Sequence, residues 1–147
     1  MEYTPLMHLD LRSPLIFVKT GEIPENLTEN EDFLLCFELD SAQSRNIEPN
    51  RERLLGSLVF SGRKTGDSDD IQAEAVSLPA GNYLFTQRRD VNPAVLNSDG
   101  WLDMAIEQQK DGLWERYRLE NRLYVRFLFE DGGFVTQLFR SLSAPKV

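Results

Sequence analysis

The sequence predicts an α+β fold in which duplicated β-α-β-β units form a curved antiparallel sheet. Short apolar runs rich in β-branched residues alternate with two helix-like segments, and a strong hairpin turn joins the last two runs. The order of elements repeats over residues 14–78 and 79–142, within one domain that spans residues 1–147. Two helices would cover one face of the sheet, which leaves the other face for a ligand cleft.

The first unit begins with a strand at residues 15–18, which are apolar and β-branched. Residues 32–47 fit one face of a helix and also the alternation of a strand, so their period is ambiguous. The length of the run favours a helix, and the repeat of two units depends on that choice. The unit is completed by predicted strands at 54–60 and 71–78, with a polar loop at 61–70.

The second unit begins with a strand at residues 82–88, after the turn Pro79-Ala80-Gly81. A helix is predicted over residues 99–111, where Gly112 ends it. Its apolar stripe consists of Trp101, Leu102, Ala105 and Ile106. Beyond it the period becomes two, and the unit ends in a predicted hairpin through Asp131-Gly132-Gly133 to a strand at 134–142.

Composition and charge exclude several classes of protein. The 147-residue chain has a net charge of −8, and an acidic protein repels the phosphate backbone, so we expect no direct nucleic-acid binding. No run approaches the ~18–20 apolar residues of a membrane helix, and the first residues lack the basic start of a secretory signal. Cys36 is the only cysteine, so no internal disulfide can form. We therefore expect a cytoplasmic protein.

Few residues are suited to metal binding or nucleophilic catalysis. His8 is the only histidine, and it lies near an end of the chain that no predicted element anchors. A metal cluster needs several His or Cys side chains, which this chain does not have. It also lacks the glycine-rich loops that bind phosphates and dinucleotides. We expect no metal and no cofactor, and the sequence favours a binding protein over an enzyme.

The alternation over residues 114–130 identifies a candidate acid. Five of the eight odd positions from 115 to 129 are strongly apolar, so the odd face should point inward and the even face towards solvent. Glu115 falls on the inward face, where a carboxylate must be paired or reserved for a ligand. The alternative is that Glu115 lies before the alternation begins. Asn121 interrupts the same face and marks either a bulge or a polar pocket wall.

Two patches of sequence resemble the GyrI-like family of effector-binding domains. The stretch Ser77-Leu78-Pro79-Ala80-Gly81-Asn82-Tyr83-Leu84-Phe85 resembles the beginning of a strand in that family. Glu115-x-Tyr117, after the predicted helix, resembles its Glu-x-Tyr strand, and the predicted order of elements is also similar. The chain departs from the family at Gln87-Arg88-Arg89-Asp90, where a His-x-Gly-like segment is usual.

The resemblance implies that a cleft between the two halves binds a small organic ligand, with Glu115 as the ligand-facing acid. The candidate ligand-binding residues are Glu115, Tyr117, Trp101, Tyr83, Phe85 and Asn121. Rings and one acid suit an aromatic or lipophilic guest, including a cationic one, although the same rings are otherwise ordinary core residues. Two alternatives are a small-molecule hydrolase in which Glu115 activates water and an acidic module that docks on a protein partner.

Overall fold

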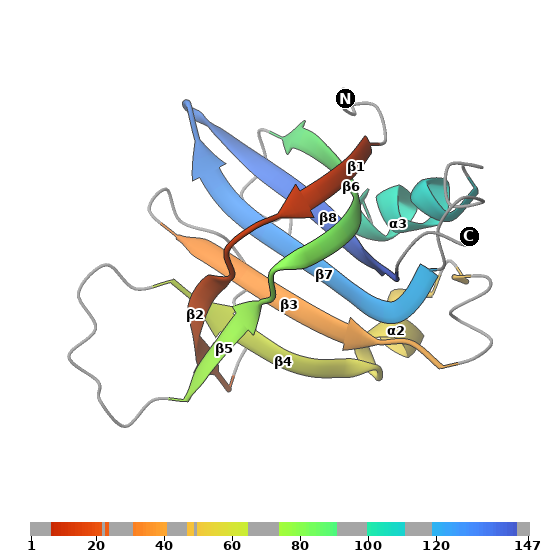
Figure 1. Cartoon of the computed structure of the whole chain (residues 1–147), viewed down its shortest axis with the longest axis horizontal. Coiled ribbons are helices and arrows are strands. Elements are labelled where there is room, and N and C mark those ends of the chain that lie inside the picture. The colour runs from red at the N-terminus through yellow and green to blue at the C-terminus, as the bar shows by residue number, and fades with distance from the viewer. Residues whose placement is uncertain are drawn as a thin grey trace.

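The computed structural model describes residues 7–21, 23, 31–40, 47–48, 50–64, 74–90, 100–110 and 119–143. Within these residues the fold is an antiparallel sheet of eight strands, curled into a half-barrel, with two helices (Figure 1). The strands are β1 (Met7–Leu11), β2 (Leu15–Thr20), β3 (Asp32–Glu38), β4 (Leu58–Arg63), β5 (Ala75–Leu78), β6 (Gly81–Asp90), β7 (Leu119–Glu130) and β8 (Gly133–Leu142). The helices are α2 (Arg51–Leu55) and α3 (Gly100–Lys110). The curved antiparallel sheet is confirmed, but the described fold is mostly sheet.

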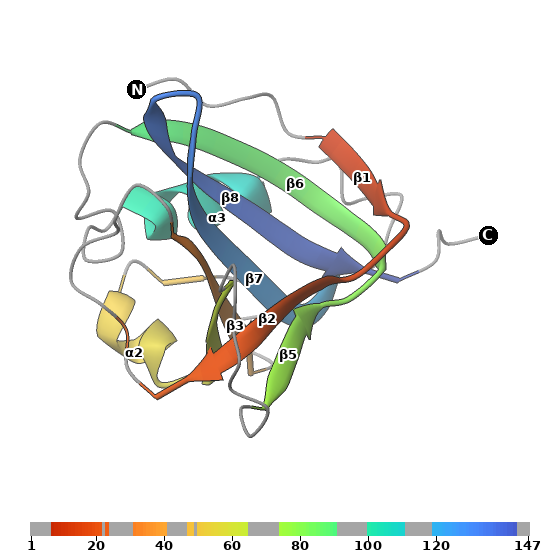
Figure 2. The same cartoon turned by 90° about the vertical axis from the view of Figure 1, so that its left-hand side faces the viewer.

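Two short connections make the sheet curl. The strand order is β1-β6-β8-β7-β3-β4-β2-β5, so β1 at one edge and β2 near the other are six strand spacings apart, as are β5 and β6. In a flat sheet six spacings would measure about 29 Å. Residues 12–14 join β1 to β2, and the step from Leu11 to Leu15 spans at most about 14 Å. The sheet therefore bends until its two edges approach each other, as Figure 2 shows.

The two edges of the sheet belong to one bent ribbon, formed by residues 7–20 and 75–90. β1 pairs with β6, and β2 pairs with β5, both antiparallel. The two pairings continue across the bend, because Leu11 is opposite Gly81 and Leu15 is opposite Leu78. The bent ribbon then joins the rest of the sheet on both sides, through β8 and β4.

Each face of the sheet carries its own buried core. The helix-side core packs α2 and α3 against one face; α3 was predicted there, whereas α2 was not. Its main residues are Phe33, Leu35, Phe37, Leu54, Trp101, Leu102, Met104, Ala105, Leu123, Val125, Phe127 and Leu138. The inner core lies on the inside of the curl and consists of Phe17, Leu34, Cys36, Leu78, Tyr83, Phe85, Tyr124 and Phe139. The face opposite the helices is therefore lined with packed side chains.

The helix predicted over residues 32–47 is wrong at its start, where the structure has strand β3. Leu34 and Cys36 are buried inside the curl, while Phe33, Leu35 and Phe37 are buried against the helices. Both faces of β3 are thus apolar, which removes the alternation that identifies a strand. Residues 41–46 lie outside the described residues. Without the helix at Asp32–Glu38, the duplicated β-α-β-β order is not confirmed.

Other elements agree with the prediction to different degrees. β2, β6, α3 and the β7–β8 hairpin are confirmed. Of the strand predicted at 54–60, the first part is instead the end of α2, whose N-terminus is capped by the Asn50 side chain, which accepts a hydrogen bond from Arg53 N at 3.1 Å. β1 was not predicted, and it places His8 Nε2 3.0 Å from Asn82 Oδ1. Neither described helix has the length and apolar character needed to cross a membrane.

Candidate functional site

A row of side chains crosses six neighbouring strands inside the curl. The strand registers place these side chains next to one another in sheet order: Met7, Phe85, Phe139, Tyr124, Cys36 and Phe60, here termed the aromatic row. The ring centroids of Phe85 and Phe139 are 5.0 Å apart, and the rings of Tyr83 and Phe139 are nearly perpendicular, with centroids 5.7 Å apart. Four of the six are buried, whereas Met7 at the edge is 43% exposed. The row is therefore a nearly continuous apolar wall that opens at β1.

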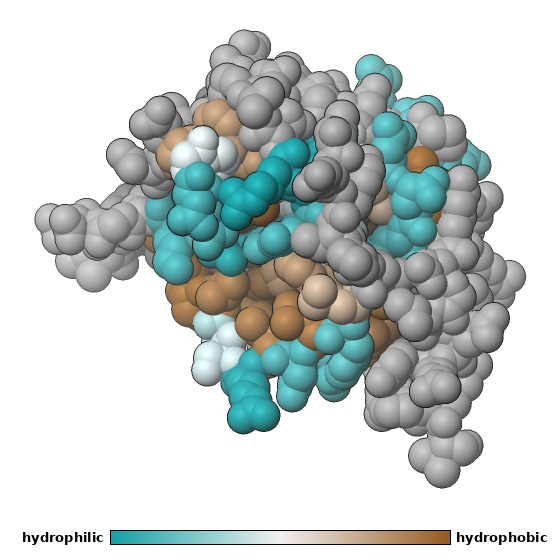
Figure 3. Space-filling model, turned by 90° about the horizontal axis from the view of Figure 1, so that it is seen from above, coloured by the Kyte–Doolittle hydropathy of each residue, from teal (hydrophilic) through white to brown (hydrophobic). Residues whose placement is uncertain are grey.

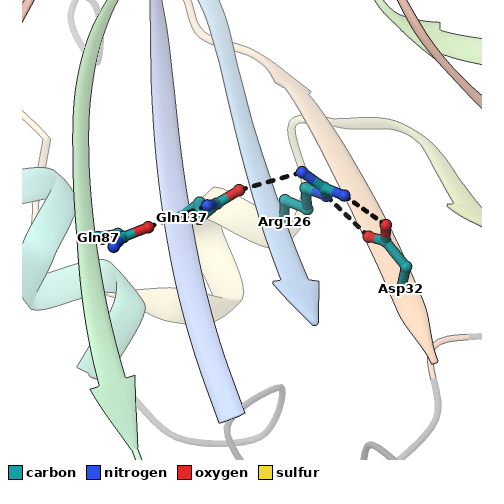
Figure 4. Close-up of polar contacts among 4 residues, drawn as sticks. All are labelled: Asp32, Gln87, Arg126 and Gln137. Atoms are coloured by element: carbon teal, nitrogen blue, oxygen red, sulfur yellow. Dashed lines mark hydrogen bonds and ion pairs between the residues drawn. The ribbon is translucent and has the colours of Figure 1, made fainter. Parts of the chain in front are cut away.

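A second row lies one step closer to the β7–β8 hairpin, on the same face. Gln87, Gln137 and Arg126 are in register on β6, β8 and β7, and Asp32 lies diagonally across from Arg126 on β3. We term these four residues the polar row; Figure 4 shows them on the side of the sheet away from the helices. All four are partly exposed, so solvent reaches the inside of the curl along this row.

Hydrogen bonds link the polar row from end to end (Figure 4). Arg126 donates to both carboxylate oxygens of Asp32, at 2.8 Å from Nε and 2.5 Å from Nη2. Arg126 Nη1 also donates to Gln137 Oε1 at 3.3 Å, and Gln137 Nε2 donates to Gln87 Oε1 at 3.0 Å. The side chains of Arg126 and Asp32 are only 16% and 17% exposed. The row thus holds one matched pair of charges and two neutral amides in a largely desolvated place.

The aromatic row and the neighbouring Tyr83 contain ionisable groups whose neutral form burial favours. Burial raises the pKa of the Cys36 thiol, against the opposing effect of Arg122, whose Nη1 lies 3.3 Å from the sulfur. Burial also raises the pKa of Tyr83 to about 12 and moves the pKa of Tyr124 upward. Tyr83 donates a short hydrogen bond to the Pro79 carbonyl oxygen. These three side chains are therefore uncharged at neutral pH and offer a thiol and two rings with hydroxyl groups.

Polar groups are also buried on the helix side of the sheet, under α3. Arg88 and Arg140 are each 2% exposed. Arg140 Nε donates to the Glu120 carbonyl at 2.8 Å, and burial lowers the pKa of Arg140 to about 10. The Arg88 guanidinium lies where a side chain at Gly100 would begin, since a Cβ there would be 2.2 Å from Nη2. Arg88 of β6 thus packs against the beginning of α3, and Arg140 of β8 is hydrogen-bonded to the beginning of β7.

The structure separates the predicted site residues that it describes. Tyr83 and Phe85 lie together inside the curl, 3% and 9% exposed. Trp101 lies on the other side of the sheet, where it stacks on Phe37 with ring centroids 5.5 Å apart. Asn121 is exposed near the beginning of β7. Of the predicted aromatic walls that the structure describes, Tyr83 and Phe85 therefore lie together, whereas Trp101 does not join them.

Glu115 and Tyr117 lie outside the described residues, so their roles as ligand-facing acid and ring stay predictions, as does the hydrolase alternative. The inward odd face of the same run is confirmed at Leu123, Val125 and Phe127, which are fully buried. The prediction that the even face lies in solvent is wrong at Tyr124, which is 5% exposed. That face of β7 lines the inside of the curl, so both faces of the strand are covered at Tyr124, whereas Glu120 and Glu130 on the same face are exposed.

The polar row was not predicted as a site, although the sequence contains a signal for it. Arg126 interrupts the apolar run 123–129, and Gln87 shares a strand face with Tyr83 and Phe85. Gln87 is a polar residue on a mostly apolar strand face, and Arg126 is a charged residue within an apolar run; either marks a break in the core or a place for a ligand. Only the strand register shows that these positions are neighbours.

The surface adds two observations. Seen from above the view of Figure 1, hydrophobic residues gather between two bands of hydrophilic residues (Figure 3), so this side presents an apolar strip to solvent. Among the described residues, no three His, Cys, Asp or Glu side chains gather in a way that could hold a metal ion.

Comparison of the chain with protein-family models, with curated proteins and with solved structures finds no match.

Proposed function

We propose that this chain binds a small aromatic or lipophilic ligand inside the curl of its sheet, where the aromatic row meets the polar row. One observation carries the proposal: four polar side chains within reach of solvent lie one step from a wall of buried rings. Small-molecule sites combine such an apolar wall with a few hydrogen-bonding groups that orient the guest. Tyr83 and Phe85, which the sequence singled out, belong to this wall.

The resemblance to the GyrI-like family supports the same class of ligand. In that hypothesis Glu115 supplies a countercharge and Tyr117 a further ring, which suits a cationic guest. The contacts of the polar row do not depend on either residue. Binding inside the curl and recognition of a cation by Glu115 are therefore two separate questions.

Thermal unfolding of the wild-type protein against a panel of aromatic cations and neutral lipophiles tests the proposal. A ligand that binds only the folded chain stabilises it, by about 2.7 kcal/mol at a concentration of about 100 times its Kd. We expect a rise in Tm with some members of the panel. If no compound in a broad panel raises the Tm, the proposal is rejected.

Two matched variants locate the site. Phe139→Leu changes the inner core and Phe127→Leu the helix-side core, and both rings are almost completely buried. Both variants should lose stability, but only Phe139→Leu should also bind more weakly the compounds that stabilise the wild type. Equal loss of binding in the two variants would place the site elsewhere. Glu115→Gln tests the countercharge alone, because it should weaken only the cationic compounds.

A further inference from the structure

The charges inside the curl are already matched, which restricts the ligand that the proposed site can take. Arg126 and Asp32 form a two-point contact, and each side chain is more than four-fifths buried. A carboxylate guest would have to draw Arg126 away from Asp32, and an ammonium guest would have to draw Asp32 away from Arg126. Either exchange leaves one charge without its partner in a desolvated place, which is strongly unfavourable.

Gln137 lies at the centre of the polar row and retains hydrogen-bonding capacity. A primary amide offers two N–H groups and two carbonyl lone pairs. Within the described part of the chain, Gln137 uses one N–H towards Gln87 and one lone pair towards Arg126. One donor and one acceptor on the same planar group therefore remain. The side chain is partly exposed, so a guest inside the curl can reach it.

The surroundings of Gln137 are apolar on the same face of β8. Val135 and Phe139, two residues before and after it, are 0% and 3% exposed. Phe139 in turn packs against Phe85 at 5.0 Å between ring centroids. A guest that hydrogen-bonds to Gln137 thus places its adjoining ring against this aromatic pair. Edge and offset contacts between rings favour such an arrangement.

We infer that the ligand of this site is a flat aromatic molecule with a neutral amide or lactam group, which pairs with the free N–H and carbonyl lone pair of Gln137. A group of this kind supplies an acceptor and a donor side by side and leaves the pair formed by Arg126 and Asp32 intact. The inference rests on the proposed function and narrows its ligand, which the sequence had left open to cations.

A series of compounds with one ring system tests the inference. Naphthamide, naphthoate and naphthylmethylamine share the ring and differ in charge. We expect naphthamide to raise the Tm of the wild type most and to have a Kd at least tenfold below those of the other two by calorimetry. A Kd for either charged compound equal to or below that of naphthamide would overturn the inference. If none of the three binds while other lipophiles do, the inference fails and the proposed function stands; no binding by any compound rejects both.

Two substitutions at Gln137 make the test specific. Gln137→Leu removes donor and acceptor, so the Kd values of the three compounds should converge. Gln137→Glu places a carboxylate in the row, so naphthylmethylamine should become the best ligand and naphthamide should lose at least tenfold in affinity. Arg89→Gln is the control, since Arg89 lies at the exposed rim near Asp131. An unchanged order of the three compounds in both Gln137 variants would refute the role of Gln137.

Discussion

Gly62 of β4 lies so close to Phe17 of β2 that a Cβ atom at position 62 would be 2.9 Å from the Cβ of Phe17. The same atom would be 2.8 Å from Cγ2 of Val76. Both distances are shorter than real Cβ atoms show, so the inner core leaves no room for even a methyl group here. The curl of the sheet is therefore packed tightly where β2, β4 and β5 meet.

Gly62→Ala should destabilise the protein by about 1–3 kcal/mol, because the added methyl group forces strands apart. The matched control is Gly21→Ala, since a Cβ at position 21 meets nothing within 4 Å. We expect that control to change stability by less than about 0.5 kcal/mol. Urea unfolding of the two variants checks the difference, and equal effects would contradict the close packing.

Breaking the charge pair of the polar row should cost more than breaking an exposed pair. Arg126→Gln should lower the free energy of unfolding by about 1.5–3 kcal/mol, because Asp32 loses two charged hydrogen bonds in a largely buried place. Arg53→Gln breaks a pair with Glu48 whose side chains are 49% and 54% exposed, and it should cost less than about 1 kcal/mol. Urea unfolding measures both variants.

A double substitution separates the pair from its surroundings. Asp32→Asn combined with Arg126→Gln leaves no unmatched charge, so it should cost less than the sum of the two single variants. Additive effects would show that the two side chains stabilise the protein independently, contrary to their contact.

The stability of the protein should fall at high pH in part because of Tyr83. Its pKa in the folded protein is about 12, above its ordinary value of 10, so the folded chain binds more protons between these values. The contribution of Tyr83 is complete below about pH 10 and is lost as the pH rises towards about 12. In Tyr83→Phe the urea midpoint should fall less steeply over this range. Parallel curves for the two proteins would exclude Tyr83 as the cause.

The thiol of Cys36 should be unreactive in the folded protein. It is 0% exposed, and burial raises its pKa, so both access and the thiolate form are suppressed. Reaction with an aromatic disulfide reagent should be roughly 100-fold slower than in the urea-unfolded chain at the same pH, because the thiol reacts only after local opening. Since the chain has one cysteine, the released chromophore reports this site alone. Reaction at the unfolded rate would contradict the buried position of the thiol.

Local sequence patterns predicted the parts of the fold that depend on neighbouring residues. The turn Asp131-Gly132-Gly133 has positive φ at its first two residues, 51° and 78°. The hairpin was predicted because Asp-Gly favours this backbone conformation. α3 was predicted from its apolar stripe. β1, which was not predicted, has a clear alternation, in which Leu9 and Leu11 pack inside the curl and His8 is exposed.

The parts that failed depend on contacts between distant segments. β3 is apolar on both faces only because the curl covers one face and the helices cover the other, which no local period can show. Local patterns also cannot show which face of the sheet a ring packs against. The sequence therefore predicted Trp101 and Tyr83 as walls of one site, although the sheet lies between them. The polar row needs the register of four strands, and the two members of its charge pair, Asp32 and Arg126, are 94 positions apart.

The bent ribbon also influences how fast the chain can fold. Within it, the side chains of His8 and Asn82 are hydrogen-bonded across 74 positions, while the β7–β8 hairpin closes through a turn of adjacent residues. Long loops must close before such distant pairs stabilise them, and domains dominated by these pairs fold in about milliseconds to seconds. We expect stopped-flow refolding on that time scale. Since β1 can pair with β6, and β2 with β5, only after both arms of the ribbon have met, joining these two arms should be the slow step.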